Sequence, residues 1–556
     1  MARPVGPVGR LWRWCRRRPA MAALTAAVFL VTLTGLSLFF WQWRQAEAAR
    51  RAEAAAKEKA QQQFAELARA HLRLAEVTQA VSSTAEAIQL YQQTLSLFDR
   101  LVREQPTVSD HRLNAAQVRS KLGALYLDIG QTKEAETAFR TALEMIEPLA
   151  QERPDTLRYH QVKAQTLAEL GRLYRATNQT ARAKECLSQA LTVYSKLVQD
   201  QPELIDYQHE LATVHNRLGV LYRWEPNRAL DSFREALKIQ ERLVREHPEN
   251  LGYRNDLAIT LYNLGNRWCR NKPHLDQAEA AYVRARQLWE EMVGKHPLVH
   301  SYQLALAKCL GSLAGVYQDT SRLDKAATTY RRAMSILEEL VVVNPTISDY
   351  ALTFAVTATK LADLDCEPPQ AKLEWCSKAI DKLEGILKRD PQNALTKQFL
   401  YGSLQRRAWA LTDLGRHAEA LRDWDHALEG AGGADRDALR LGRTISLAHL
   451  GDHVRAIAEV NELTGKARGD GEVFYHAACV HALSSAAALR DRRLPEGERA
   501  LRAERYATDA VELLRKARAA GYFKDRARIG QLSKDEDLAP LRSREDFRKL
   551  VAALMP

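Results

Sequence analysis

Cysteine is scarce in this sequence and shows no pairing pattern. The chain has seven cysteines among 556 residues, an odd number, and no two of them form a C-x-x-C pair. A disulfide framework or a zinc site built on closely spaced cysteines is therefore not expected. Isolated cysteines inside helices usually serve as small buried apolar residues.

Sequence motifs of common enzymes are also missing. The chain has no H-E-x-x-H, Walker A, G-x-S-x-G or Rossmann glycine pattern. Acidic pairs are frequent, but within helices they usually form solvated faces. We therefore expect a protein that is not an enzyme, with no catalytic residue, no bound metal and no cofactor.

Positive charge is in excess, but it is concentrated at one end. Residues 1–59 hold eleven Lys and Arg against three acids, so +8 of the net charge of +12 lies there and +4 in the other 497 residues. A nucleic-acid site needs clustered charge on the folded part of a protein. The distribution argues against a nucleic-acid partner.

Charged residues are absent from 19–43, a run of 25 residues. A bilayer core of about 30 Å needs roughly 20 helical residues, and Trp41 and Trp43 fall where an interfacial aromatic belt would lie. The alternative is a cleaved signal peptide, which Ala46-Glu47-Ala48 would suit as a cleavage pattern. The apolar part of such a peptide is usually about 7–15 residues, so we favour a transmembrane helix.

The basic residues around this helix predict its orientation. Six Arg lie in the basic segment 1–18 and five Lys or Arg in 44–59. This small bias places the N-terminus in the cytoplasm and the C-terminal part outside. Residues 44–63 are rich in Ala, Glu, Lys, Arg and Gln, which predicts a charged linker helix.

Prolines recur with a period of 46–49 residues from 106 to 391, and each is expected to end a helix. They are Pro106, Pro154, Pro202, Pro248, Pro297, Pro345 and Pro391. A small–large–small triplet precedes six of the seven prolines on one helix face, as in Ala135, Phe139 and Ala142, whereas Lys372 replaces the expected Ala before Pro391. Upstream, L-G-x-L-Y recurs at 122–126, 170–174 and 218–222, and the costly helical Gly suggests that another helix crosses closely there.

These residues resemble the tetratricopeptide-repeat (TPR) family, whose pattern is L-G-x2-Y … A-x3-F-x2-A … P. The unit 122–142 matches it residue by residue, although the period exceeds that family's 34 by about 12–15, which longer helices would absorb. The resemblance implies an all-α fold in which helix pairs stack into an α-solenoid. We expect long-period repeats over 64–391, shorter repeats over 392–525, and a C-terminal cap over 526–556.

A closer resemblance is to the C-terminal half of planctomycete-type membrane serine/threonine protein kinases. It rests on the membrane entry at 12–19, the charged helix after the span, the segment Tyr475–Val480, and the Asp-x-Asp-Leu-x-Pro-Leu-Arg tail at 535–542. The kinase domain of such proteins precedes the span, where this chain has about 18 residues, and no H-R-D-x-x-x-x-N or D-F-G occurs. The sequence therefore predicts a membrane-anchored scaffold, or alternatively the regulatory half of such a kinase.

A peptide-binding groove is expected on the first helices of the middle repeats, near the recurring Gly. Arg and Asn there would bind carboxylates and peptide backbone of a protein partner, whereas the plainer interpretation is charge displayed to water. The candidate groove residues are Arg172, Arg175, Asn216, Arg223, Asn266, Arg270 and Lys308.

Overall fold

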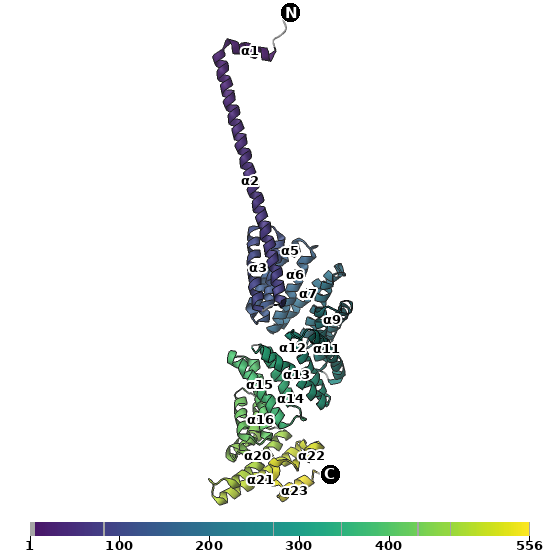
Figure 1. Cartoon of the computed structure of the whole chain (residues 1–556). Coiled ribbons are helices and arrows are strands. Elements are labelled where there is room, and N and C mark those ends of the chain that lie inside the picture. The colour runs from purple at the N-terminus through teal and green to yellow at the C-terminus, as the bar shows by residue number, and fades with distance from the viewer. Residues whose placement is uncertain are drawn as a thin grey trace. The chain divides into compact units, whose positions relative to one another are not determined.

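The protein is described here from a computed structural model that covers residues 6–81, 84–270, 272–345, 347–430, 433–467 and 469–554. Throughout these ranges every regular element is a helix, and the helices alternate in antiparallel pairs (Figure 1). The predicted all-α solenoid is confirmed. Its elements divide into a first helix (A) and a second helix (B) of each pair.

The A helices from α4 to α16 each begin after one of the recurring prolines, and A and B helices alternate along the chain. The A helices are α4 (Ser109–Asp128), α6 (Leu157–Ala176), α8 (Ile205–Leu221), α10 (Leu251–Trp268), α12 (His300–Asp319), α14 (Ser348–Ala362), α16 (Ala394–Asp413), α18 (Gly433–His449) and α20 (Gly471–Arg490). The B helices are α3 (Thr84–Glu104), α5 (Thr132–Glu152), α7 (Thr180–Asp200), α9 (Pro226–Glu246), α11 (Leu275–Lys295), α13 (Leu323–Val343), α15 (Pro369–Arg389), α17 (His417–Gly430), α19 (His453–Lys466) and α21 (Glu496–Ala519).

Shorter elements complete the chain. They are α1 (Pro7–Arg17), η1 (Lys272–His274), η2 (Tyr522–Lys524), α22 (Arg526–Leu532), η3 (Glu536–Leu541) and α23 (Glu545–Ala552). The chain divides into two compact units, an N-terminal unit of residues 1–221 and a C-terminal unit of residues 222–556, and each is described by itself.

The N-terminal unit begins with one exceptionally long helix, α2 (Pro19–Val81), of 63 residues (Figure 1). Its apolar start is the one stretch of the described chain with the length and hydropathy of a membrane span, and none of that stretch is buried. Its far end packs Ala68, Leu72 and Ala75 against α3. The helix therefore runs from the apolar segment, through the charged residues 44–63, into the first A-helix position.

Each B helix of the long-period repeats ends two residues before its proline, as the period predicts. α5 ends at Glu152 before Pro154, and α7 ends at Asp200 before Pro202. The residue between adopts non-helical geometry, with Arg153 at φ −135° and ψ 74°. The proline ring excludes helical geometry in that residue, so the sequence period becomes the structural period.

The helical Gly of the A helices accepts the large side chain of a B helix. A Cβ on Gly123 would lie 2.8 Å from the Phe139 ring, and one on Gly265 would lie 2.6 Å from the Tyr282 ring. Leu187 occupies the same place over Gly171, at 2.7 Å. The predicted close approach is confirmed, and the aromatic ring itself fills the space that a side chain would need.

The loop expected between the last two long helices is present but shorter than the sequence suggests, over 491–495. The segment 490–499 reads as an inserted loop, but α20 continues to Arg490 and α21 begins at Glu496. Pro495 is the residue before α21, and Glu496 and Glu498 occupy the first turn. Acidic residues are favourable at a helix N-terminus, which explains why the helix starts earlier than the charge pattern suggests.

Candidate functional site

Three arginines gather on the A helices α6 and α8 of the N-terminal unit, around two acids. Arg172 donates to Glu169 at 2.8 Å and to Asp128 of α4 at 2.7 Å. Arg217 of α8 donates to the other oxygen of Glu169 at 2.7 Å. Together with Arg175, these side chains form what we call the arginine cluster, which carries one positive charge in excess.

Backbone contacts repeat along the same line. Arg172 reaches the carbonyl of Ala124 at 3.4 Å, and Arg217 reaches the carbonyl of Ala168 at 2.9 Å. Each arginine therefore lies across the A helix of the preceding repeat. Because α4 contacts α6 and α6 contacts α8, the A helices form one continuous layer in this unit.

Glu169 is the centre of the cluster, with its side chain 17% exposed. Burial would raise the pKa of Glu169, but the guanidiniums of Arg217 and Arg172 outweigh it and lower the pKa. The carboxylate is therefore ionised at neutral pH and holds both arginines in place. Some of the N–H donors of each of those guanidiniums are therefore already bonded within the protein.

Arg175 differs from its neighbours. It is exposed, and no ion pair or hydrogen bond of its side chain is found within the described residues. Although the residue as a whole is exposed, its neighbours take part of the guanidinium out of water. This desolvation, and then repulsion from Arg217 and Arg172, lowers the pKa of Arg175, but an arginine stays protonated in proteins. Two fixed positive neighbours and no carboxylate of its own make Arg175 the open cation of the cluster.

The predicted groove residues are divided between the two units. Arg172, Arg175 and Asn216 belong to the N-terminal unit, and Asn216 is half-buried. The structure brings the two arginines together, and Asn216 has an interaction partner of its own.

In the C-terminal unit, the other four residues have separate surroundings. Asn266 accepts a hydrogen bond from the Tyr282 hydroxyl at 2.7 Å, and Lys308 pairs with Asp349 at 2.7 Å. Arg223 lies over the Trp224 ring at 4.8 Å, and Arg270 is exposed. Two of the four are thus occupied by partners within the protein.

Sequence reasoning missed Glu169 and Arg217, which hold the cluster together. Both stand two residues before the helical Gly, at Gly171 and Gly219, and Lys121 occupies the same register one repeat earlier. The sign of the charge therefore alternates from one repeat to the next at this register. That alternation was the available signal, because side chains at equivalent positions of stacked repeats are neighbours.

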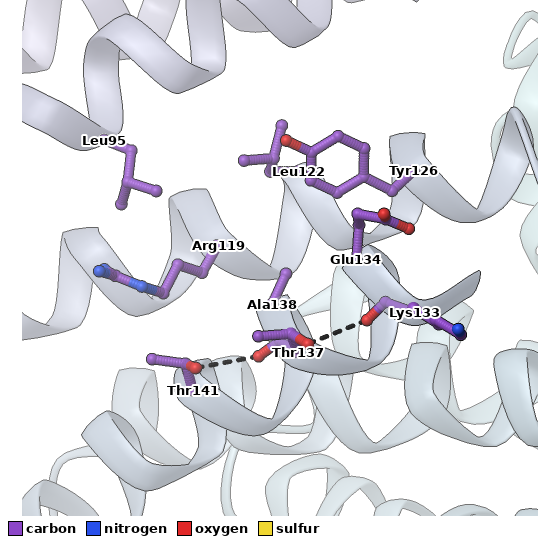
Figure 2. A pocket seen from close by; sticks show the side chains of 9 residues that line it. All are labelled: Leu95, Arg119, Leu122, Tyr126, Lys133, Glu134, Thr137, Ala138 and Thr141. Carbon is purple, nitrogen blue, oxygen red and sulfur yellow. Dashed lines mark hydrogen bonds between the residues drawn. The ribbon is translucent and has the colours of Figure 1, made fainter. Parts of the chain in front are cut away.

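A separate cleft of about 380 Å³ lies between α3, α4 and α5 (Figure 2). Leu95, Leu122 and Ala138 form its apolar part. Its hydroxyls are already satisfied, since Thr137 donates to the Lys133 carbonyl at 2.9 Å and Thr141 to that of Thr137. None of the predicted groove residues lines this cleft.

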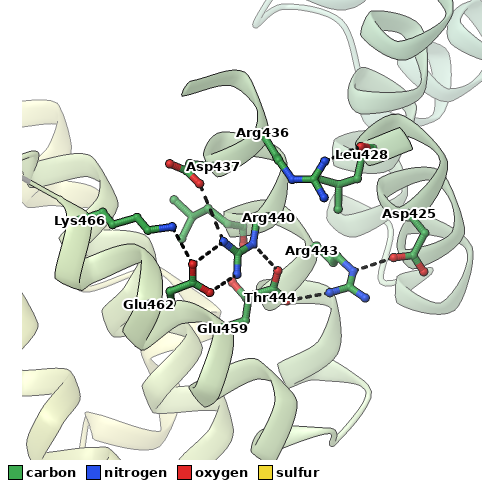
Figure 3. A network of polar contacts seen from close by, with 11 residues as sticks. Asp425, Leu428, Arg436, Asp437, Arg440, Arg443, Thr444, Glu459, Glu462 and Lys466 are labelled. Carbon is green, nitrogen blue, oxygen red and sulfur yellow. Dashed lines mark hydrogen bonds and ion pairs between the residues drawn. The ribbon is translucent and has the colours of Figure 1, made fainter. Parts of the chain in front are cut away.

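An ionic network lies on α17, α18 and α19 of the C-terminal unit (Figure 3). Glu459 accepts from Arg440 at 2.8 Å and from Arg443 at 2.7 Å. Arg440 also donates to Glu462, and Arg443 to Asp425, each at 2.7 Å. Each arginine is shared between two acids on different helices or turns, so the network is suited to joining helices rather than to binding a ligand.

Within the described residues, Cys479, Asp535 and Asp537 are the group whose donor atoms lie near enough for a shared cation, within 4.8 Å of one another. The two carboxylates have other partners. Tyr475 donates to Asp535 at 2.5 Å, and His449 lies 2.8 Å from Asp537. Burial, followed by the two carboxylates, raises the pKa of the Cys479 thiol well above its usual range. The contacts therefore dock the C-terminal tail on α20.

Comparison with solved structures gives only distant similarities. BtubC from P. vanneervenii is 19% identical with a TM-score of 0.36, covering 47% of this chain and 92% of its own. Apo RapI is 15% identical with a TM-score of 0.35, covering 57% and 97%. A tetratricopeptide repeat protein from Parabacteroides merdae is 15% identical with a TM-score of 0.29, covering 62% and 99%. These TM-scores are too low to carry an argument.

Sequence comparison is more specific, although no curated protein matches the chain. Residues 116–148 and 164–196 match the tetratricopeptide repeat family. The matched ranges contain the Gly123–Phe139 and Gly171–Leu187 contacts that hold α4 to α5 and α6 to α7. The chain therefore carries tetratricopeptide repeats, and its helix pairs form a TPR-type α-solenoid.

Proposed function

We propose that this protein is a membrane-anchored scaffold that binds protein partners on the A-helix layer of its N-terminal unit. The observation that carries the proposal is Arg175, an exposed guanidinium with no partner within the described residues beside two arginines fixed by Glu169. A carboxylate of an acidic segment or of a chain terminus would complete its hydrogen bonds. Arrays of stacked helix pairs commonly bind extended segments in this way.

The membrane part of the proposal rests on α2. Its most apolar stretch has a mean hydropathy of 2.1 and is exposed along its whole length, as a helix surrounded by lipid would be. Core helices of soluble proteins can be as long and as apolar, but other elements of the protein cover them. The small excess of Arg before the span favours an N-terminus in the cytoplasm and an array outside it.

The remaining groove residues differ in whether their side chains are available to contact a partner. Arg223 and Arg270 are exposed and suit a contact with a partner, whereas Asn266 and Lys308 would first have to leave Tyr282 and Asp349. We therefore place the main binding site in the N-terminal unit.

The test replaces Arg175 with Ala and compares it with Arg158→Ala. Arg158 is an exposed arginine on the same helix α6, so the change in net charge and helix propensity is equal. The probe is a fluorescent glutamate-rich peptide with a free C-terminal carboxylate. A charge-assisted hydrogen bond contributes about 1.5–3 kcal/mol, so Arg175→Ala should weaken binding roughly ten- to hundredfold.

Arg158→Ala should bind the peptide as the natural protein does, and both variants should keep the same helicity. Equal affinities of the two variants would contradict a binding role for Arg175. Recovery of the full chain in a soluble fraction after a high-salt wash of membranes would contradict the anchor.

A second candidate function is the regulatory half of a membrane serine/threonine kinase. One observation favours it: Tyr475 donates to Asp535, so two segments that carry the kinase resemblance, 60 residues apart, meet in one contact. In-frame H-R-D and D-F-G motifs in the DNA upstream of Met1 would support this function over the scaffold. Their absence from the DNA there would favour the scaffold.

A further inference from the structure

A short helix in front of the long one has two sharply different faces. Helix α1 has 11 residues, and Val8, Leu11, Trp12 and Cys15 follow one another at helical spacing on one face. Arg10, Arg13 and Arg17 occupy the opposite face. No residue of α1 is buried, and Leu11 and Trp12 are each 63% exposed. The apolar face has no covering element within the described residues.

The sequence explains why α1 is a separate helix. Pro7 starts it at a position where a proline is tolerated, and Pro19 ends it by excluding helical geometry from Arg18, which has φ −138° and ψ 68°. The chain therefore turns between α1 and α2, and α1 does not continue the axis of α2 (Figure 1). A sideways helix at the end of a spanning helix lies close to the plane of the membrane, because spanning helices tilt by only about 20° on average.

Charge selects the kind of surface that α1 fits. The sequence has no Asp or Glu before Glu47, so nothing on α1 or on the apolar stretch neutralises the arginines. A helix with an apolar face containing Trp and Leu and a polar face of Arg binds at the boundary between lipid headgroups and acyl chains. Anionic headgroups would pair with the arginines.

We infer that α1 lies in the headgroup layer of the membrane that α2 enters, with Leu11 and Trp12 among the acyl chains and Arg10, Arg13 and Arg17 on anionic lipid phosphates. The inference rests on the proposed membrane anchor. It adds a second, lipid-selective contact to that anchor. It also fixes the depth of α2, because a helix lying in the interface cannot be drawn through the bilayer.

The test measures amide hydrogen exchange of residues 7–17 in the full chain. The protein is reconstituted in vesicles of phosphatidylcholine alone and in vesicles of equal phosphatidylcholine and phosphatidylglycerol. We expect exchange of residues 7–17 to be about tenfold slower or more in the anionic vesicles than in phosphatidylcholine alone, since a docked helix must detach before it opens.

Three variants separate the two faces. L11E/W12E should lose the protection of residues 7–17 in both kinds of vesicle. R10Q/R13Q/R17Q should lose the difference between them. R44Q/R50Q/R51Q is the matched control, because it removes three arginines from the other end of the span, and it should behave as the natural chain.

The outcomes distinguish this inference from the proposed function on which it rests. A chain that stays with the vesicles in high salt while residues 7–17 exchange rapidly would overturn the inference and leave the anchor standing. A chain that washes off would overturn both. Protection that rises with protein concentration and ignores lipid charge would assign the apolar face of α1 to a second copy, and would also overturn the inference.

Discussion

The first long-period repeats and the later short-period repeats join their helices with different chemistry. Around α4 and α5 the contact is apolar, with Phe139 seated over Gly123. Around α18 and α19 an ionic contact is added to the apolar one, with Glu459 held between Arg440 and Arg443 (Figure 3). The helices differ in length as well, since α5 has 21 residues and α19 has 14.

Helix length and contact chemistry are connected. α5 buries Ala135, Phe139, Ala142, Ile146, Leu149 and Ala150, whereas α19 buries Ala456, Val460, Leu463 and one histidine. Burying a Val, Leu, Ile or Phe side chain contributes about 1.5–3 kcal/mol, so the additional turns of α5 are a sizeable part of the stability of its helix pair. The short pairs bury less and fix their geometry with oriented charges.

Truncating the apolar contact should have the largest effect. Phe139 is fully buried, and Phe139→Ala would leave a cavity above Gly123 that neighbouring helices cannot fill. We expect a loss of about 3–5 kcal/mol in the free energy of unfolding. Urea denaturation followed by circular dichroism measures it, with Thr141→Ala, a half-buried residue of the same helix outside the Gly123 contact, as the control. A smaller loss than that caused by Glu459→Ala would contradict the view that the apolar contact contributes more stability than the ionic one.

Acid should lower the stability of the short-period repeats. His481 of α20 is 2% exposed, and burial, followed by Arg505, lowers its pKa from 6.5 to about 4. Between these values the unfolded chain binds a proton that the folded chain does not. The stabilisation is therefore complete above about pH 6.5 and is lost as the pH falls toward 4, by about 2 kcal/mol between pH 7 and pH 5.

Urea titrations at those two pH values measure the effect, and His481→Gln should reduce it. His417, whose pKa burial and His449 lower to about 4, would contribute the remainder. If the natural protein and His481→Gln lose the same free energy of unfolding between pH 7 and pH 5, protonation of His481 does not cause the loss.

The ionic contact should be the least costly of the three to break. Glu459→Ala would leave Arg440 and Arg443 with Glu462 and Asp425 as partners, and their side chains are 18% and 17% exposed. We expect a loss of about 1–2 kcal/mol, because nearby acids and water compensate in part. Asp437→Ala, which removes an exposed acid 3.9 Å from Arg440, should change little. Equal losses from the two variants would mean that burial of Glu459 does not matter.

Much of the fold followed from local rules, and much of the candidate site did not. The proline period predicted the B-helix ends because proline acts on its immediate neighbour, and the Gly–aromatic register predicted the A–B contact because both belong to one repeat. The pairing of Arg172 with Asp128 depends on how neighbouring repeats stack, across 44 residues. Long side chains reach in several directions, so sequence spacing alone could not separate the open Arg175 from its occupied neighbour.

The continuity of α2 has a mechanical consequence. Residues 44–63 are exposed helix with no covering element along most of their length, and at 1.5 Å per residue they form a strut about 30 Å long. On the proposed anchor, with residues 19–43 in the bilayer, the strut would hold the first repeat up to about 30 Å from the lipid surface. The strut would then set the height at which the first repeat meets a partner, so a ligand anchored in the same membrane would need a stalk of similar length to reach that repeat.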